Sequence, residues 1–336
     1  MMSTCTARPE GRRSSTITQS ILAAFLGFSL TSAAASAQSY PSKPVQVVVP
    51  FAAGGGVDTA TRVVADVAGE ILGQRFAIDN RGGGSTIIGT QAVARAEADG
   101  YTLLAAPTTM VINPALKSSI PYNWETDFVP IALLAKLPFV VVAGKDLPAS
   151  TMSELAALGK QSEDGLTFGS GGAGTVAHLA GEFFAQRSGA KMVHVPYRGE
   201  APALVDAIGG QIAVMFSTLA SASGHIQSGQ LKPLAVTTKE RASLLPDVPT
   251  VAEQGYPDYD LSAWIALVAP KETPRPVIET LNKAFNEALK RPDLRERLTK
   301  LGAEPAGGTP EELAAFMKKD AGIWAEVVKT GGVKAE

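Results

Sequence analysis

The sequence predicts an α/β protein with two lobes, each built on a mostly parallel sheet with helices on both faces. Three observations favour this fold class. Short apolar segments alternate with helical segments along the chain, and the alternation restarts near residue 166. Strand–helix alternation of this kind is typical of βα units and parallel sheets. The third observation is length, because a chain of about 300 residues is typical of two domains.

The N-terminus has the pattern of a secretory signal peptide. Arg8, Arg12 and Arg13 precede an apolar segment at 21–30, and small residues lead to Ala35-Ser36-Ala37. A basic region, a short apolar core and an Ala-x-Ala site predict export with cleavage near Ala37. The alternative is a membrane anchor, although the core is shorter than the about 20 residues that a span needs. Export by the unfolded route or by the twin-arginine route stays open.

The mature chain has no cysteine and a small negative charge. Removing 37 residues from 336 leaves 299, and the single Cys5 is among those removed, so no disulfide or thiol chemistry is expected. The removed segment also takes three of 30 basic and one of 32 acidic residues, which leaves 27 against 31 and a net charge near −4. Such a composition predicts no nucleic-acid partner, which would need a basic surface.

The first part of the mature chain alternates between strands and helices. The valine-rich run 45–49 is suited to a strand that is buried on both faces. Apolar residues recur at helical spacing from Ala60 to Ile71 and predict a helix. The next predicted strands are 76–78, 102–105, 129–134 and 139–142.

The pattern restarts in the second part of the chain. Residues 166–168 predict a strand, and apolar residues between 179 and 184 predict a helix with one packed face. From Pro274 onward the sequence is mainly helical. There, Thr309-Pro310-Glu311-Glu312 predicts a helix start, because it combines a capping box with proline at the first helical position. Further strands are predicted at 192–195, 212–216 and 234–236.

Two glycine-rich loops, each between a strand and a helix, are the main functional signal. The first covers 51–58 and the second covers 169–175. Glycine leaves backbone N–H groups uncovered, and a helix N-terminus adds unpaired N–H groups and partial positive charge. Each loop therefore predicts an anion site at the carboxyl end of a strand. The pair could hold both ends of a diacid, or one carboxylate; the alternative is that both loops are ordinary tight turns.

The motifs of several other protein classes are missing. Counted from Gly54, the dinucleotide-binding pattern G-x-G-x-x-G would end on Thr59, and no G-x-x-x-x-G-K-[ST] loop occurs. The three histidines have no metal-ligand spacing. We therefore expect no metal, no cofactor and no enzymatic activity. A hydrolase stays an alternative, since triads form in space, although G-x-S-x-G around Ser170 would need glycine at Phe168.

An ordered set of short motifs extends over nearly the whole mature chain. The motifs are Tyr40-Pro41-Ser42-Lys43-Pro44, Pro50-Phe51 with Gly54-Gly55 and Asp58, Asp79-Asn80-Arg81-Gly82-Gly83-Gly84, Asp99-Gly100-Tyr101-Thr102-Leu103-Leu104, His194-Val195-Pro196-Tyr197-Arg198-Gly199, Gly209-Gly210-Gln211, Leu234-Ala235-Val236-Thr237, and Trp264 with Pro270. In these motifs the chain resembles the Bug-type receptors, which are the substrate-binding components of tripartite tricarboxylate transporters.

The resemblance implies a periplasmic-binding-protein-like clamshell with two crossover hinge strands. The implied first lobe contains residues 38–140 and 262–336, and the second contains 141–261. Ligand carboxylates would be held by backbone amides and ordered water in the cleft and delivered to the subunits of a membrane permease. We expect a periplasmic monomer that binds a di- or tricarboxylate, an amino acid or an aromatic acid. Presentation of the ligand to a periplasmic sensor, such as a sensor kinase, is the alternative to transport.

The resemblance also assigns residues to the ligand site. The first loop would form the floor of one carboxylate site, and the second loop with His178 the opposing wall. At the position of Arg198 the relatives often carry lysine. The Arg198 guanidinium could clamp a carboxylate bidentately. At the position of Ser217 many relatives carry aspartate. That departure favours a less basic, more anionic or aromatic ligand. The predicted ligand-binding residues are Phe51, Ala53, Gly54, Gly55, Gly56, Asp58, Thr108, Thr109, Ser170, Gly171, Gly172, Thr175, His178, Arg198 and Ser217.

Several of these residues have a structural alternative. Asp58 cannot attract an anion, so it either caps the helix or bonds a ligand hydroxyl, amine or water. Thr108 and Thr109 could donate hydroxyl groups or be ordinary turn residues. His178 could face the ligand, or cap and pack its helix, and Arg198 could be solvent-exposed.

Overall fold

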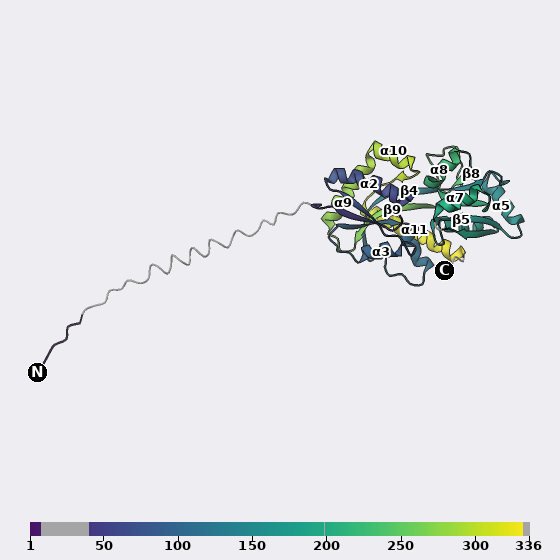
Figure 1. The fold of residues 1–336 in the computed structure, drawn as a ribbon. Coiled ribbons are helices and arrows are strands. Elements are labelled where there is room, and N and C mark those ends of the chain that lie inside the picture. Colours follow the sequence, from purple (N-terminus) through teal and green to yellow (C-terminus); the bar gives the residue numbers. More distant parts are fainter. Residues whose placement is uncertain (8–39, 198, 332–336) are drawn as a thin grey trace. The chain divides into compact units, whose positions relative to one another are not determined.

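The structure is a computed structural model that describes residues 1–7, 40–197 and 199–331 (Figure 1). The chain divides into two units, residues 1–40 and 41–336, and every helix and strand described below lies in the second unit. Most of the predicted signal peptide, including Ala37, lies outside the described residues, as does Arg198. Within the described ranges, no helix combines the length and the apolar content that crossing a membrane requires.

The first sheet begins with three parallel strands in the order β2-β1-β3. The strands are β1 (Val45–Val49), β2 (Phe76–Asn80) and β3 (Thr102–Pro107). They alternate with α2 (Gly56–Leu72), α3 (Ile87–Ala94) and α4 (Thr109–Leu116). Val47, Val48 and Val49 are fully buried, as the sequence predicts for a strand covered on both faces.

The second sheet repeats this design with three parallel strands in the order β7-β5-β6. The strands are β5 (Leu166–Ser170), β6 (Met192–Pro196) and β7 (Val214–Thr218), and β8 (Leu231–Val236) pairs elsewhere in the same sheet. The helices are α5 (Met152–Gln161), α6 (Val176–Ser188), α7 (Glu200–Ile208) and α8 (Leu219–Gln227). Figure 1 shows these teal elements grouped apart from α2, α3 and the first sheet.

Two long strands, β4 (Phe128–Gly144) and β9 (Ser262–Pro270), run from one sheet toward the other. β4 pairs with β9 as far as Pro138 and with β7 from Phe139 onward, so a single strand belongs to both sheets. The sequence predicted two strands here and none at β9. The two predicted strands merge because Lys136, the charged residue between them, has an exposed side chain while its backbone stays paired with Trp264.

The strand directions differ in part from the prediction of mostly parallel sheets. Strands joined by βα units are parallel, whereas β4 and β9 pair antiparallel with each other and with their other neighbours β3, β7 and β8. Each sheet is therefore mixed. Neither β4 nor β9 is joined by a single helix to a strand with which it pairs, so the rule that makes βα-linked strands parallel does not apply to these pairs.

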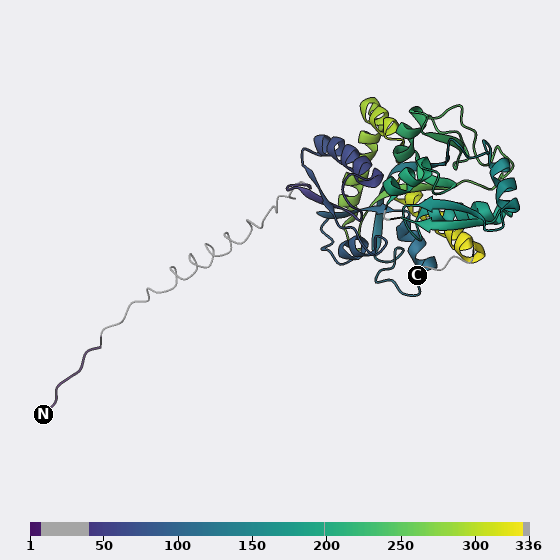
Figure 2. The same cartoon turned by 45° about the vertical axis from the view of Figure 1, so that its right-hand side comes forward.

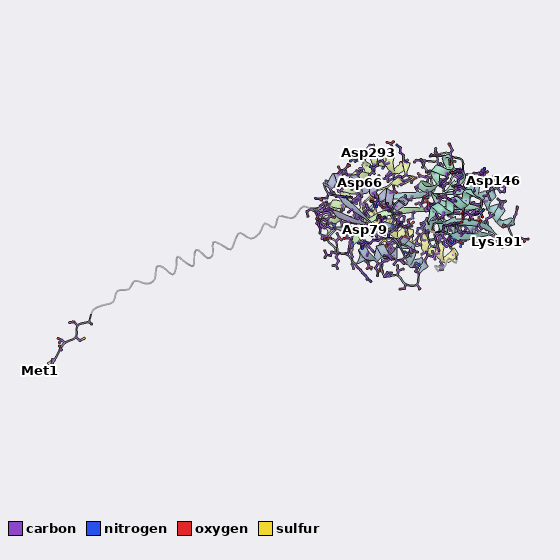
Figure 3. All side chains as sticks on the ribbon, viewed as in Figure 1. Met1, Asp66, Asp79, Asp146, Lys191 and Asp293 are labelled. Carbon is purple, nitrogen blue, oxygen red and sulfur yellow. The ribbon has the colours of Figure 1, made fainter. Side chains whose placement is uncertain are left out.

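The C-terminal part is mainly helical, as predicted. Its elements are α9 (Arg275–Lys290), α10 (Pro292–Lys300), the short strand β10 (Glu304–Pro305) and α11 (Pro310–Gly331). The capping box is confirmed, since the Thr309 N–H donates to Glu312 Oε2 at 2.8 Å and the Glu312 N–H donates to Thr309 Oγ1 at 3.1 Å. The exposed side chains of Asp66, Asp146 and Lys191 lie at the outer surface of this unit (Figure 3).

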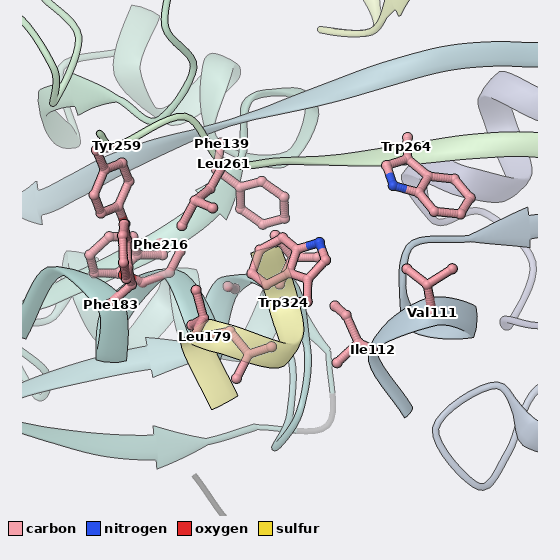
Figure 4. Packing of buried hydrophobic residues seen from close by; sticks show 14 of the residues in the cluster. Val111, Ile112, Phe139, Leu179, Phe183, Phe216, Tyr259, Leu261, Trp264 and Trp324 are labelled. Carbon is pink, nitrogen blue, oxygen red and sulfur yellow. The ribbon is translucent and has the colours of Figure 1, made fainter. Parts of the chain in front are cut away.

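Helix α11 packs against both halves of the unit. It contacts α4 beside the first sheet and α6 beside the second, and Figure 2 shows it as the yellow helix next to the teal half of the unit. Trp324 of α11 is fully buried and lies beside Leu179 and Ile112 in Figure 4. One apolar core therefore extends through both halves. Because α11 contacts both, the assignment of all residues after 262 to the first lobe stays a prediction.

Candidate functional site

A cavity of about 470 Å³ lies where the loops of the two sheets face each other. Both halves of the chain and both connecting strands contribute to its wall. The lining residues include Phe51, Ala53, Gly54, Gly55, Gly56, Thr108, Thr109, Leu137, Phe139, Gly171, Thr175, Gly199, Glu200, Thr218 and Trp264.

Five helices begin at the wall of this cavity. Their N-cap residues are Gly55 of α2, Thr108 of α4, Thr175 of α6, Gly199 of α7 and Thr218 of α8, and all five line the cavity. The first N–H groups of a helix have no partner within it and carry partial positive charge. Among the described lining residues there is no lysine or arginine. The wall is therefore suited to bind an anion through backbone N–H groups.

A second cavity, of about 530 Å³, lies near the other side of the connecting strands. It is lined by Lys136 and Pro138, which alternate along β4 with Leu137 and Phe139 of the first cavity. Successive side chains of a strand point to opposite faces. Both acidic and basic side chains, Arg241 among them, line this second cavity, and none of the five N-cap residues does. We therefore place the candidate site in the 470 Å³ cavity.

The first glycine-rich loop is shaped by Asp58 from behind the wall. The Gly54 N–H donates to Asp58 Oδ2 at 2.8 Å, and Gly54 has a φ of +87°, a conformation that favours glycine. Burial raises the pKa of Asp58, but hydrogen bonds from Arg62, the Gly54 N–H and Asn80 outweigh it, so the pKa lies below its usual value. Asp58 is 2% exposed and does not line the cavity. Its carboxylate therefore orders the loop.

The N-terminus of α2 stays open toward the cavity. Gly55, its N-cap, has no side chain that could accept a hydrogen bond from the first turn, and no side-chain cap is present. Phe51, Ala53 and Gly56 line the cavity beside it. This helix end therefore leaves its first N–H groups for a ligand.

The second loop is held by a buried pair of polar side chains. Ser170 Oγ lies 2.6 Å from His194 Nε2 and donates to the Gly172 carbonyl at 2.9 Å. Ser170 is fully buried and does not line the cavity, whereas Gly171, the next residue, does. Although the pair resembles a nucleophile and its base, it lies behind the wall and supports the loop. Burial lowers the pKa of His194 to about 3, with a further contribution from His178.

His178 also lies behind this wall. Its Nδ1 accepts a hydrogen bond from the Gly174 N–H at 3.0 Å, and its ring stacks on His194 with centroids 3.7 Å apart. Thr175 lines the cavity and caps α6 by accepting from the His178 N–H at 3.4 Å. His178 itself does not line the cavity. Its contacts are those of a residue that caps and packs its helix.

The remaining predicted residues divide between the wall and its support. Thr108 and Thr109 line the cavity; Thr108 Oγ1 accepts from the Trp264 N–H at 2.7 Å, and Thr109 Oγ1 is 2.9 Å from Thr86 Oγ1. Ser217 is fully buried behind the wall. Nine of the predicted residues line the cavity: Phe51, Ala53, Gly54, Gly55, Gly56, Thr108, Thr109, Gly171 and Thr175.

Sequence reasoning missed two residues of this region. Glu200 lines the cavity, and its carboxylate accepts from the hydroxyl and the N–H of Thr218 at 2.6 and 3.2 Å. The only sequence signal for it was its position directly after the motif that ends at Gly199. His194 begins one of the motifs that carry the family resemblance, but sequence reasoning assigned it no role in the site. Its contact with Ser170 follows from the pairing of β5 with β6, which local sequence does not contain.

Comparisons with known proteins agree with this architecture. BugT of Bordetella pertussis (strain Tohama I / ATCC BAA-589 / NCTC 13251) is 36% identical over 316 residues, which are 94% of this chain and 97% of BugT. The structure of R. palustris Rpa4515 with adipate is 33% identical, with a TM-score of 0.82, over 88% of this chain and 99% of that one. The periplasmic binding protein BugD is 36% identical, with a TM-score of 0.79, over 88% and 100%.

These likenesses confirm the predicted two-lobe, periplasmic-binding-protein-like α/β fold. The family model described as "Tripartite tricarboxylate transporter family receptor" matches residues 60–333, which is most of the sequence. The resemblance to Bug-type receptors is confirmed by the same findings. The chain therefore belongs to the receptor family of the tripartite tricarboxylate transporters.

Proposed function

We propose that this protein is an extracytoplasmic receptor that binds a small organic carboxylate in the 470 Å³ cavity and delivers it to a tripartite tricarboxylate-type permease. The observation that carries the proposal is the convergence of five helix N-termini on one cavity. Carboxylates bind well at such ends because N–H groups and partial positive charge point at the ligand. The bound adipate of Rpa4515 supports a carboxylate as the ligand class.

The position of the carboxylate follows from which helix ends are open. In the half built on the first sheet, α2 has Gly55 at its N-cap and no side-chain cap, and α4 has none either. We place the ligand carboxylate at α2. Leu137 and Phe139 of β4, with Trp264 of β9, provide an apolar wall for the carbon skeleton. Burial of that skeleton would contribute about 25 cal/mol for each Å² of apolar surface removed from water.

The proposal includes export and the absence of catalysis. The signal-peptide pattern that ends at Ala37 would place the mature chain in the periplasm. Ser170, the candidate nucleophile of the hydrolase alternative, is fully buried behind the cavity wall. We therefore assign Ser170 to support of the loop and propose that the ligand leaves unchanged.

Ligand class is tested by thermal denaturation of residues 38–336 with a panel of small carboxylates and the amides made from them. A ligand present at 100 times its Kd should stabilise the fold by about 2.7 kcal/mol, which is visible as a raised midpoint. We expect hits among the acids that disappear on amidation. A panel without any response to acids would overturn the proposal.

The carboxylate position is tested by replacing Gly55 with aspartate. Gly55 has β-region dihedrals, and a Cβ there meets only the Ala52 carbonyl, at 3.9 Å, so the substitution fits the backbone. Aspartate at an N-cap favours the helix but places a carboxylate at the proposed site. We expect Gly55→Asp to keep its thermal midpoint and to bind at least about tenfold more weakly than the neutral control Gly55→Asn. Equal affinities in the two variants would remove α2 from the site.

A further inference from the structure

We propose that Glu200 makes this receptor selective for acids that carry one carboxylate and, at the other end, a hydrogen-bond donor such as an ammonium or hydroxyl group. The inference rests on the proposed function, because it assigns the two ends of a carboxylate ligand to the two sides of the 470 Å³ cavity. Glu200 is the one charged side chain among the described residues of its wall.

The Glu200 carboxylate occupies the beginning of α8. Thr218, the N-cap of that helix, donates to it with its hydroxyl and its N–H, and the Ser217 hydroxyl donates to Oε2 at 3.3 Å. Its side chain also passes over Gly171 of the second loop, where a Cβ would lie 3.5 Å from Glu200 Cγ. The carboxylate is thus held in place, and a ligand carboxylate at this side would meet a negative charge.

One oxygen of this carboxylate has spare acceptor capacity. Oε2 accepts from both hydroxyls and the Thr218 N–H, whereas Oε1 accepts only from that same N–H within the described part of the chain. A carboxylate oxygen can accept about two hydrogen bonds. When a ligand removes water from the cavity, an unmet acceptor on a charged group costs free energy. A ligand donor next to Oε1 would remove that cost.

The other side of the cavity has the opposite character. Of the described residues of the first half, none with an acidic side chain lines this side, and Asp58 is buried behind the loop. The N-termini of α2 and α4 have no side-chain cap there, whereas α6 and α8 are capped by Thr175 and Thr218. The helix α7 begins with Glu200 itself, which offsets its partial positive charge. A ligand with one carboxylate at the N-terminus of α2 and one hydrogen-bond donor at Glu200 therefore matches the two sides of the cavity.

This arrangement also changes the expectation attached to Ser217. Taken alone, serine at position 217 leads to the expectation of a less basic, more anionic or aromatic ligand. In the structure Glu200 supplies a negative charge beside Ser217, and the Ser217 hydroxyl donates to it. The side of the cavity near α8 is therefore anionic.

Matched ligands that differ only at the far end test the inference. The series is adipate, hexanoate and the hexanoates with a terminal hydroxyl or a terminal ammonium group, with the corresponding butyrates and succinate as a shorter series. The same four end groups (carboxylate, methyl, hydroxyl and ammonium) are also compared on the carbon skeleton of the acid that binds most tightly in the thermal screen. Calorimetric titration gives Kd values for the wild type, for Glu200→Gln, which keeps an acceptor but loses the charge, and for Glu287→Gln, an exposed control on α9.

We expect the wild type and Glu287→Gln to bind the donor-bearing acid at least about tenfold more tightly than the diacid. Glu200→Gln should lose most of that preference, mainly through tighter binding of the diacid. If the wild type binds carboxylates but Glu200→Gln ranks the four end groups in the same order, the role of Glu200 is wrong and carboxylate binding stands. If no carboxylate binds either protein, the proposed function fails together with the inference.

Discussion

The second glycine-rich loop depends on a histidine that is kept neutral. His194 Nε2 lies 2.6 Å from Ser170 Oγ, and the His194 ring stacks on His178 with centroids 3.7 Å apart and lies tilted against Phe168 with centroids 5.0 Å apart. Burial and, to a smaller extent, the neighbouring His178 together lower the pKa of His194 to about 3. Within the described residues His194 forms no ion pair, and the nearby Glu182 carboxylate lies 3.6 Å from His178 Nε2, so protonation would place an unpaired positive charge at the His194 ring. The neutral ring is therefore part of the support for Gly171.

This pKa predicts a loss of stability in acid. An unfolded histidine titrates near pH 6.5, so above that value His194 is neutral in both states and its contribution is complete. As the pH falls from about 6.5 toward 3, the unfolded state binds the proton first, and the free energy of unfolding decreases. Urea unfolding at about pH 8 and about pH 5 should show a smaller decrease for His194→Gln than for the wild type.

The control for this prediction is His225→Gln, because His225 is at the end of α8 and bonds Gln230 instead of the stack. It should retain the pH dependence of the wild type. The prediction is wrong if His194→Gln and His225→Gln lose the same amount of stability between the two pH values.

At the level of elements, one carboxylate joins the strand β9 to the helix α11. Asp320 Oδ2 accepts from the indole N–H of Trp264 at 2.7 Å and from that of Trp324 at 2.8 Å. Burial raises the pKa of Asp320, although both indole bonds lower it. Trp264 is also bonded to Thr108 through its backbone and lines the cavity. The C-terminal helix thereby positions one wall of the site.

Removing this acceptor should destabilise the protein more than removing its charge. Asp320→Ala leaves two indole N–H groups without their partner, and we expect a loss of about 2–4 kcal/mol in the free energy of unfolding. Asp320→Asn keeps an acceptor oxygen and should lose less than half as much. Chemical denaturation of both variants measures the difference, and losses of equal size would contradict the role assigned to the indole bonds.

At the level of the whole molecule, the two connecting strands determine which motions are available. The lobes are joined through β4 and β9, and the cavity is lined by Leu137, Phe139 and Trp264 of these strands and by loops of both lobes. Two strand crossings are the arrangement of a hinge that closes around a ligand. A ligand that contacts both sides favours the closed state by the difference in its affinity for the two states.

Closure predicts a change in size on ligand binding. Small-angle scattering of the mature chain should give a smaller radius of gyration with a saturating carboxylate than without one. Glucose at the same concentration is a neutral control that should leave the profile unchanged. Superimposable profiles for the free and the carboxylate-saturated protein would rule out hinge closure as the binding response.

Much of the fold could be predicted because it depends on local patterns. The run of valines predicted β1, the helical spacing of apolar residues predicted α2, and the capping box at Thr309 formed as expected. Each of these features depends on residues that are a few positions apart. The first loop was found for the same reason, since Gly54 is needed where φ is +87°. β9 was missed, and β4 was divided in two, because their pairing partners lie more than 70 residues away in the chain.

By itself, the sequence determined the fold class, the family motifs and the glycine-rich loops that provide N–H groups, because turn chemistry and hydrophobic periodicity act between near neighbours. Only the tertiary structure decided which residues face the cavity. It placed Ser170 and His178 behind the wall and brought Glu200 to Thr218, 18 residues further along the chain. The physical reason is that these contacts follow from the order and register of strands in the sheet, which place distant residues together.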